Sequence, residues 1–220
     1  VLRSFTDFVF SPWAIAQYAH TMIASVVTAS FVVAAVGAFY TLRGVHKQAA
    51  AFFLRWGVRV GVVAAVLVAF PTGDQQAKLV ARHQPAALAA MEGRFESGTH
   101  AELTFIGQPN VRERRIDNAI GAPAVLSILA FGTPQRSVQG LNDFPEKNWP
   151  SNIELLYYSF HVMAGLGTLF IALLALSTFF DWRNRLVTSR PLLWCLMLAF
   201  PFPYIATTAG WMTAELGRQP

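Results

Sequence analysis

Four long apolar stretches dominate this sequence and restrict what it can fold into. They cover residues 12–42, 49–70, 155–180 and 192–214. Each is long enough to cross a hydrocarbon core of ~30 Å as a helix, which takes about 20 residues. The sequence therefore predicts an all-α fold, an integral membrane bundle of four transmembrane helices.

The composition agrees with a membrane protein. Hydrophobic residues make up 54% of the chain and charged residues 13%, about half the charge content of a soluble domain. The net charge of +5 comes from scattered basic residues, several at the ends of apolar stretches. This placement indicates membrane topology and no nucleic-acid partner. The single Cys195 excludes a disulfide framework or a thiolate metal site within this chain.

Two of the apolar stretches contain residues that are unusual in a spanning helix. Arg55 and Arg59 lie near the start of the second stretch, where we expect their side chains to snorkel toward the lipid headgroups. Pro201 and Pro203 lie within the fourth stretch. Proline removes a helical hydrogen bond, so we expect a kink there.

The connections between the stretches predict the orientation. Residues 43–59 carry four basic side chains and no acid, and residues 181–190 carry three arginines and one aspartate. Both connections should face the cytoplasm. Residues 73–150 carry eight basic and eight acidic residues and should form a long external loop. The chain thus divides into helices one and two (1–72), this loop, and helices three and four (151–220).

The external loop is a functional candidate because it is far longer than most connections. Its Ala-rich portion, residues 77–95, should be helical. Residues 116–131 are apolar but interrupted by Gly121 and Pro123, so we expect this segment to lie at the membrane interface rather than to span it.

Three side chains in the helices are candidates for chemistry: His20, Met163 and Glu215. His20 and Met163 each lie about eight residues into a helix that runs inward, roughly 12 Å along its axis. At matching depth they have the chemistry of the two axial ligands of a low-spin haem. Alternatively, His20 bonds a neighbouring carbonyl and Met163 fills a packing gap. His161 is a rival ligand or a supporting partner.

Two carboxylates near the outer face can be interpreted either as functional groups or as ordinary surface groups. Glu92 ends the Ala-rich segment, where it would accept protons from a substrate arriving through the lipid, or would simply be solvated. Glu215 ends the fourth stretch and is either functional or an interfacial carboxylate paired with Arg218, beside the aromatic-belt residue Trp211.

Three segments resemble motifs of subunit I of the cytochrome bd quinol oxidase family, in the family's order and across essentially the whole chain. The first resembles the family's haem histidine segment, the second its quinol loop and the third its late signature. They are Gln17-Tyr18-Ala19-His20-Thr21, then Gly73-Asp74 with Gln84-Pro85 through Ala89-Ala90-Met91-Glu92-Gly93, and Gly210-Trp211 through Glu215-Leu216-Gly217-Arg218-Gln219-Pro220.

The resemblance implies roles for six residues. His20 and Met163 would be the axial ligands of haem b558, and Glu215 the ligand of haem b595. Glu92 would be an acidic residue of the quinol-oxidising loop. Two further residues would support the haems, by packing among them or by approaching a propionate: Trp211 and Arg218.

The resemblance also implies an activity, a quinol oxidase that passes electrons from quinol at the outer face through haem b558 to haems b595 and d, or to a third b-type haem. It would reduce oxygen to water and generate a proton gradient without pumping. The partners would be cytochrome bd subunit II, a small single-helix subunit, quinol and the lipid bilayer. The location would be the cytoplasmic or inner membrane of a bacterium or archaeon, and this chain would be a C-terminal half.

The chain departs from the family's pattern at two positions. A lysine often found five residues before the loop glutamate is Ala87, and an arginine often found two residues before the haem methionine is His161. The loop resembles that of members with a brief quinol loop. Two other functions stay open, a transporter or channel subunit that uses His20 as a proton relay, and a scaffold subunit that holds no cofactor.

Overall fold

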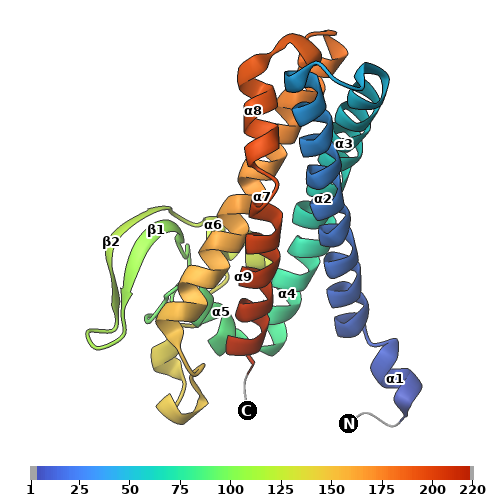
Figure 1. Cartoon of the computed structure of the whole chain (residues 1–220). Helices are drawn as coiled ribbons and strands as arrows, with labels where there is room; N and C mark the ends of the chain where they lie inside the picture. The colour runs from blue at the N-terminus through green and yellow to red at the C-terminus, as the bar shows by residue number, and fades with distance from the viewer. Residues whose placement is uncertain (1–3, 219–220) are drawn as a thin grey trace. The chain divides into compact units, whose positions relative to one another are not determined.

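The computed structural model describes residues 4–218. It is mostly helical, and four helical segments are long and apolar enough to cross a membrane (Figure 1): Pro12–Arg43, Lys47–His83, Ile153–Trp182 and Arg190–Leu216. The four predicted spans and the mostly helical fold are confirmed. Val1, Leu2 and Arg3, and Gln219 and Pro220 of the late signature, lie outside the described residues.

The first span is a continuous helix with clear signals at both ends. After the short α1 (Phe5–Val9), helix α2 (Pro12–Arg43) begins at Ser11, whose side chain accepts a hydrogen bond from the Ala14 amide, and ends at Gly44, whose φ is 71°. Serine before a helix and a left-handed glycine after it are the preferred caps.

Helix α3 (Lys47–Leu67) packs beside α2 through small residues (Figure 1). A Cβ atom at Gly37 would lie 2.3 Å from the Leu54 nitrogen, and one at Gly57 would lie 2.6 Å from the Ala34 nitrogen. Helices in lipid associate through close contacts of this kind, since water provides no driving force there.

The second span continues beyond its predicted end at residue 70. A π-helix (Val68–Gly73) follows α3 and contains Pro71, and α4 (Asp74–His83) and α5 (Pro85–Met91) come next. The Ala-rich portion predicted to be helical is therefore helical up to Met91, with an interruption at Gln84.

The predicted external loop also contains a β-hairpin that the sequence interpretation missed. Strands β1 (Leu103–Asn110) and β2 (Arg115–Ala122) are antiparallel, with Leu103 opposite Ala122 and Asn110 opposite Arg115. The segment expected as one apolar stretch, 116–131, divides into β2 and the short helix α6 (Val125–Phe131). Short 3-10 turns follow at Leu141–Asp143 and Glu146–Asn148.

The third span is the continuous helix α7 (Ile153–Trp182), and a 3-10 turn (Leu186–Thr188) leads from it to the fourth. The fourth span is interrupted between α8 (Arg190–Leu198) and α9 (Phe202–Leu216). Pro201 lies in the gap and has no amide hydrogen to continue the helix. The kink predicted from the two prolines is thus a complete break.

Contacts divide the described residues into two compact units, one of residues 4–73 and 164–207, the other of residues 74–163 and 208–218. Helices α7 and α9 contribute to both. The division into residues 1–72, 73–150 and 151–220 follows the order of the sequence, whereas these two units follow contacts. That division therefore stays a prediction. In the first unit the core is apolar and includes Phe31, whose ring centroid lies 4.9 Å from that of Phe170.

The first unit also holds an ion-pair cluster around a buried acid, which adds to the interpretation of Arg55 and Arg59. Asp181, near the end of α7, has a side chain that is 3% exposed. Arg55 Nε lies 3.2 Å from one carboxylate oxygen, and Arg59 Nη2 lies 2.6 Å from the other. The two arginines were expected only to reach for headgroups. They also compensate a buried acid, because an unpaired charge there would be costly, while their own side chains stay 42% and 50% exposed.

Candidate functional site

Glu92 is the most unusual side chain of the second unit. It follows α5, whose residues from Ala86 to Met91 are all buried, and it is itself only 3% exposed. The chain turns sharply after it, with a φ of 62° at Gly93. Glu92 Oε2 is buried and has no hydrogen-bond partner among the described residues. The alternative that Glu92 is simply solvated is therefore wrong.

Burial changes the acidity of Glu92. Removal from water raises its pKa to about 8, although the positive charge of Arg94 acts in the opposite direction. A carboxyl group that titrates near neutral pH can both take up and release a proton during turnover. Glu92 thus has the properties of a general acid–base group.

Tyr157 of α7 is a polar neighbour of Glu92 that the sequence interpretation did not identify. It is 1% exposed, its hydroxyl has no hydrogen-bond partner among the described residues, and it lies within electrostatic reach of Glu92. Gly93 makes room for the ring, since a Cβ atom there would lie 3.1 Å from Tyr157 Cδ2. Two buried polar groups without partners therefore share one region, which is typical of a functional site.

His161 does not have a nitrogen available for a metal. Its Nδ1 lies 2.9 Å from the Tyr157 carbonyl oxygen, and its Nε2 lies 2.8 Å from the Thr104 carbonyl oxygen. The ring also stacks on Tyr157, with centroids 3.9 Å apart. This geometry opposes the rival-ligand interpretation and makes His161 a support for Tyr157.

Met163 contacts helix α9. A Cβ atom at Gly210 would lie 2.8 Å from Met163 Sδ, so a larger residue at 210 would displace the thioether. This contact fits the packing interpretation of Met163. It also shows that Gly210, part of the late signature, sets the position of the sulfur.

The end of α9 presents Trp211, Glu215 and Arg218 at the surface. Trp211 is 65% exposed. Arg218 Nη2 lies 3.0 Å from Glu215 Oε1, with both side chains exposed. The predicted i, i+3 ion pair is confirmed, and the exposed Glu215 carboxylate remains accessible to a further ligand.

Ala87 of helix α5 stands where the resemblance leads us to expect a lysine. It is completely buried. A Cβ atom at Gly217 would lie 3.2 Å from Met91 Cε and 3.7 Å from Ala87 Cβ, so α5 packs closely against the end of α9. The small Ala87 side chain fits this packing.

His20 of α2 belongs to the first unit. The ring is half-buried, and its Nδ1 lies 3.3 Å from Thr72 Oγ1 of the π-helix. The alternative interpretation expected a carbonyl partner, and His20 has one as well, since its ring also hydrogen-bonds the Val68 main chain. Imidazole and thioether side chains are axial donors that haem iron takes in proteins, so His20 and Met163 fit such a group, and the exposed Glu215 carboxylate is an anionic oxygen donor. Since His20 and Met163 lie in different units, their pairing stays a prediction.

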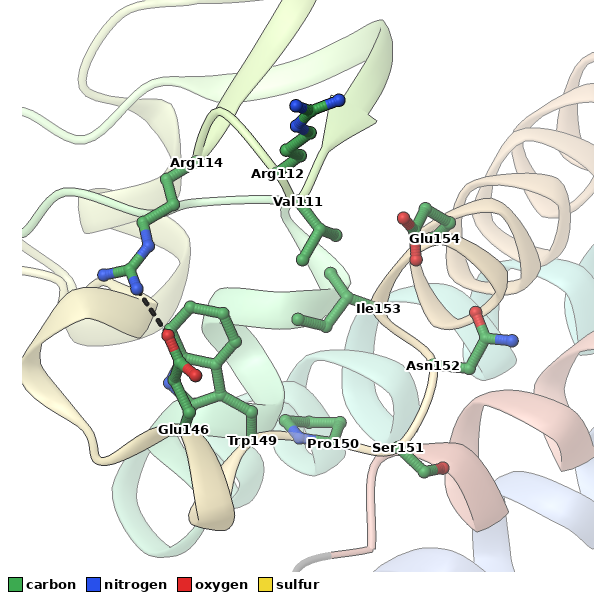
Figure 2. Close-up of a pocket in the computed structure, with 10 residues that line it drawn as sticks. All are labelled: Val111, Arg112, Arg114, Glu146, Trp149, Pro150, Ser151, Asn152, Ile153 and Glu154. Atoms are coloured by element: carbon green, nitrogen blue, oxygen red, sulfur yellow. Dashed lines mark hydrogen bonds and ion pairs between the residues drawn. The ribbon is translucent and has the colours of Figure 1, made fainter.

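The second unit also contains a polar hollow (Figure 2). Arg114 Nη2 lies 2.5 Å from Glu146 Oε1, and its guanidinium lies 5.4 Å from the centroid of the Trp149 ring. None of the predicted site residues lines it. The lining residues are Val111, Arg112, Arg114, Glu146, Trp149, Pro150, Ser151, Asn152, Ile153 and Glu154.

Comparison with known proteins places this arrangement in a family. The model of cytochrome bd terminal oxidase subunit I matches residues 1–220. A Bacillus subtilis protein named as a cytochrome bd menaquinol oxidase subunit I is 32% identical over 96% of the chain, and the cytochrome bd ubiquinol oxidase subunit 1 of the same organism is 27% identical over all of it.

A solved structure of the bd oxidase from Geobacillus thermodenitrificans is also similar, with a TM-score of 0.88 and 30% identity over 96% of the chain. Our chain covers 48% of that chain. It likewise spans about half the length of the curated relatives it matches. The matched family model covers every residue, so the chain belongs to the family of cytochrome bd terminal oxidase subunit I.

Proposed function

We propose that this chain is the half of a quinol oxidase subunit I that accepts electrons and protons from quinol. The observation that carries the proposal is Glu92, a buried carboxyl group without a hydrogen-bond partner whose pKa is raised to about 8. A quinol releases protons as it is oxidised, so the reaction needs an acceptor that titrates near neutral pH. Glu92 has this chemistry.

His20, Met163 and Glu215 are the residues that would bind haem. His20 and Met163 would bind haem b558 and Glu215 would bind haem b595, while Trp211 would pack among the haems and Arg218 would approach a propionate. The haems, when bound, supply the one-electron chemistry and the reduction of oxygen. The protein's share is to hold the donors and to take up the quinol proton at the Glu92 carboxylate.

The remaining parts of the proposal concern the assembly. Haem d or a third b-type haem, subunit II and a small single-helix subunit would complete the enzyme in the cytoplasmic or inner membrane. Residues 73–150 would face outward, so the quinol proton would be released on that side. The relatives' names contain both menaquinol and ubiquinol, and we propose quinol as the substrate class.

The test is Glu92→Gln in the complete oxidase. This change keeps the size of the side chain and removes its ability to accept a proton, so quinol-driven oxygen consumption should fall roughly 100-fold. An artificial donor that delivers electrons to the haems directly should support nearly unchanged turnover.

The matched control is Glu96→Gln, four residues further along the same segment. Glu96 is exposed, and its Oε1 accepts a hydrogen bond from Asn142 Nδ2 that a glutamine oxygen can also accept. This variant should oxidise quinol normally. Equal losses with quinol and with the artificial donor in Glu92→Gln would contradict the proposal, because they would indicate damaged haem sites or misfolding.

A further inference from the structure

The π-helix Val68–Gly73 places a hydroxyl group beside His20. Segments of π-helix are rare and often occur at functional sites. Within this one, Thr72 Oγ1 lies 3.1 Å from the Leu67 carbonyl oxygen and 3.2 Å from the Val68 carbonyl oxygen. A threonine hydroxyl has one hydrogen. That hydrogen is donated to the main chain, because both carbonyl oxygens can only accept.

The direction of the Thr72–His20 hydrogen bond follows from this geometry. His20 Nδ1 lies 3.3 Å from the same Thr72 oxygen. The hydroxyl hydrogen is directed at the main chain, so the oxygen offers His20 a lone pair, and Nδ1 is the donor. A neutral imidazole has one N–H and one free lone pair. The lone pair is therefore on Nε2.

We propose that Thr72 is a positioning residue that holds His20 with Nδ1 protonated and so presents Nε2 to the haem iron. The inference rests on the proposed role of His20 as a haem ligand. Histidines that bind metals usually donate their second ring N–H to a fixed acceptor, which sets the ring orientation and strengthens the ligand. In this chain the Thr72 hydroxyl is an acceptor for Nδ1, beside the Val68 main chain that His20 also hydrogen-bonds, and nothing in the family resemblance assigns Thr72 a role.

The local backbone maintains the contact. Pro71 fixes its own φ and has no amide hydrogen to extend a regular α-helical ladder. A Cβ atom at Gly73 would lie 2.7 Å from the Val68 carbonyl oxygen and 3.6 Å from His20 Cε1. A side chain at 73 would therefore disturb the carbonyl to which Thr72 is anchored.

The test uses the full-length protein, purified from membranes with its partner subunits, in four variants. Thr72→Val keeps the shape and removes the hydroxyl, whereas Thr72→Ser keeps the hydroxyl. Thr28→Val is the matched control, because Thr28 Oγ1 donates to the Ala24 carbonyl oxygen of the same helix as His20. His20→Ala tests the ligand itself. The readouts are the midpoint potential, the EPR spectrum and the rate of loss of the low-spin haem.

Thr72→Val should raise the midpoint potential, because a less basic imidazole stabilises ferric iron less well. It should also shift the EPR g values of the ferric haem and speed haem loss roughly tenfold. Thr72→Ser and Thr28→Val should behave like the unmodified protein, and His20→Ala should lose the low-spin haem.

Two results would overturn the inference while leaving the ligand assignment intact. One is an unchanged potential and EPR spectrum in Thr72→Val together with haem loss in His20→Ala. The other is equal damage in Thr72→Val and Thr72→Ser, since the hydroxyl would then be irrelevant. A low-spin haem that survives His20→Ala would instead refute the ligand assignment, and the inference with it.

Discussion

Asp181 and Glu92 are both buried carboxylates, but their surroundings differ. Asp181, in the first unit, contacts the guanidinium groups of Arg55 and Arg59. Glu92, in the second unit, has an oxygen with no hydrogen-bond partner among the described residues, and its pKa is raised to about 8. A buried charge is costly unless it is paired, so Asp181 is compensated and Glu92 is held in its neutral form below pH 8.

The difference shows that burial alone does not mark a functional acid. Asp181 lies between helices and ties α3 to α7, which is a structural role. Glu92 ends a short helix next to Tyr157, another buried polar group without a partner. Groups left without partners in this way are candidates for chemistry, because burying them lowers the stability of the fold.

The largest effect should appear in the pH profile of quinol oxidation. Glu92 accepts a proton only when ionised, and its pKa is raised to about 8. Quinol-driven turnover should therefore rise roughly tenfold per pH unit from pH 6 to pH 8 and then level off. Oxygen uptake measured across this range, with the artificial donor as control, checks the prediction.

The groups that face Glu92 do not alter the expected rise of quinol-driven turnover with pH. Arg94 carries a positive charge that favours ionisation, and Tyr157 is the other titratable neighbour. Stability should change in the opposite sense, because a carboxyl group whose pKa is raised on folding loses stabilisation as pH rises from its ordinary value of 4.5 toward about 8. A quinol-specific profile that is flat between pH 6 and 8 would remove the distinction between the two carboxylates.

Asp181→Asn should give the next largest effect, on stability. Removing one partner of a buried ion pair costs about 3–5 kcal/mol, but Arg55 and Arg59 are about half exposed and can be solvated. We therefore expect a loss of roughly 2 kcal/mol in the free energy of unfolding. Thermal denaturation in detergent measures the loss.

The same variant should oxidise quinol at a normal rate per folded molecule. Arg43→Gln serves as the control, since it removes a basic residue from the same predicted cytoplasmic side without touching Asp181. A pH profile for quinol oxidation that moves in Asp181→Asn would show that Asp181 also participates in proton transfer.

Tyr157→Phe should give the smallest effect. The hydroxyl has no hydrogen-bond partner among the described residues, so its removal should change the free energy of unfolding by less than about 1 kcal/mol. The ring would still stack on His161. A loss of 2 kcal/mol or more in the complete oxidase would reveal that the hydroxyl has a partner outside this half of the subunit.

The spans were predictable from sequence because hydropathy and length act locally, residue by residue. An irregularity at Pro201 was predictable for the same reason, although we expected a kink and the structure has a break. The β-hairpin was missed because residues 116–131 were treated as a single apolar stretch. The available signals were Gly121 and Pro123, which separate the strand from the helix that follows.

The candidate site was only partly predictable. The ion pair of Glu215 and Arg218 is three residues apart and could be inferred from helical spacing. The contacts of Asp181 join residues more than 120 positions apart, and no local pattern indicates them. The burial of Glu92 likewise depends on how α5 packs against distant segments, so the sequence left its environment open.

The two glycines between α2 and α3 have a consequence for how this subunit can vary. At Gly37 and Gly57 a Cβ atom would meet main-chain atoms of the neighbouring helix at 2.3 and 2.6 Å, and no change of rotamer relieves such a clash. At Gly165 and Gly167 a Cβ atom would meet nothing within 4 Å. A library of single substitutions should therefore accept alanine at Gly165 and Gly167 and reject every side chain at Gly37 and Gly57. The pair of helices α2 and α3, which carries His20, can therefore change little in sequence at this contact.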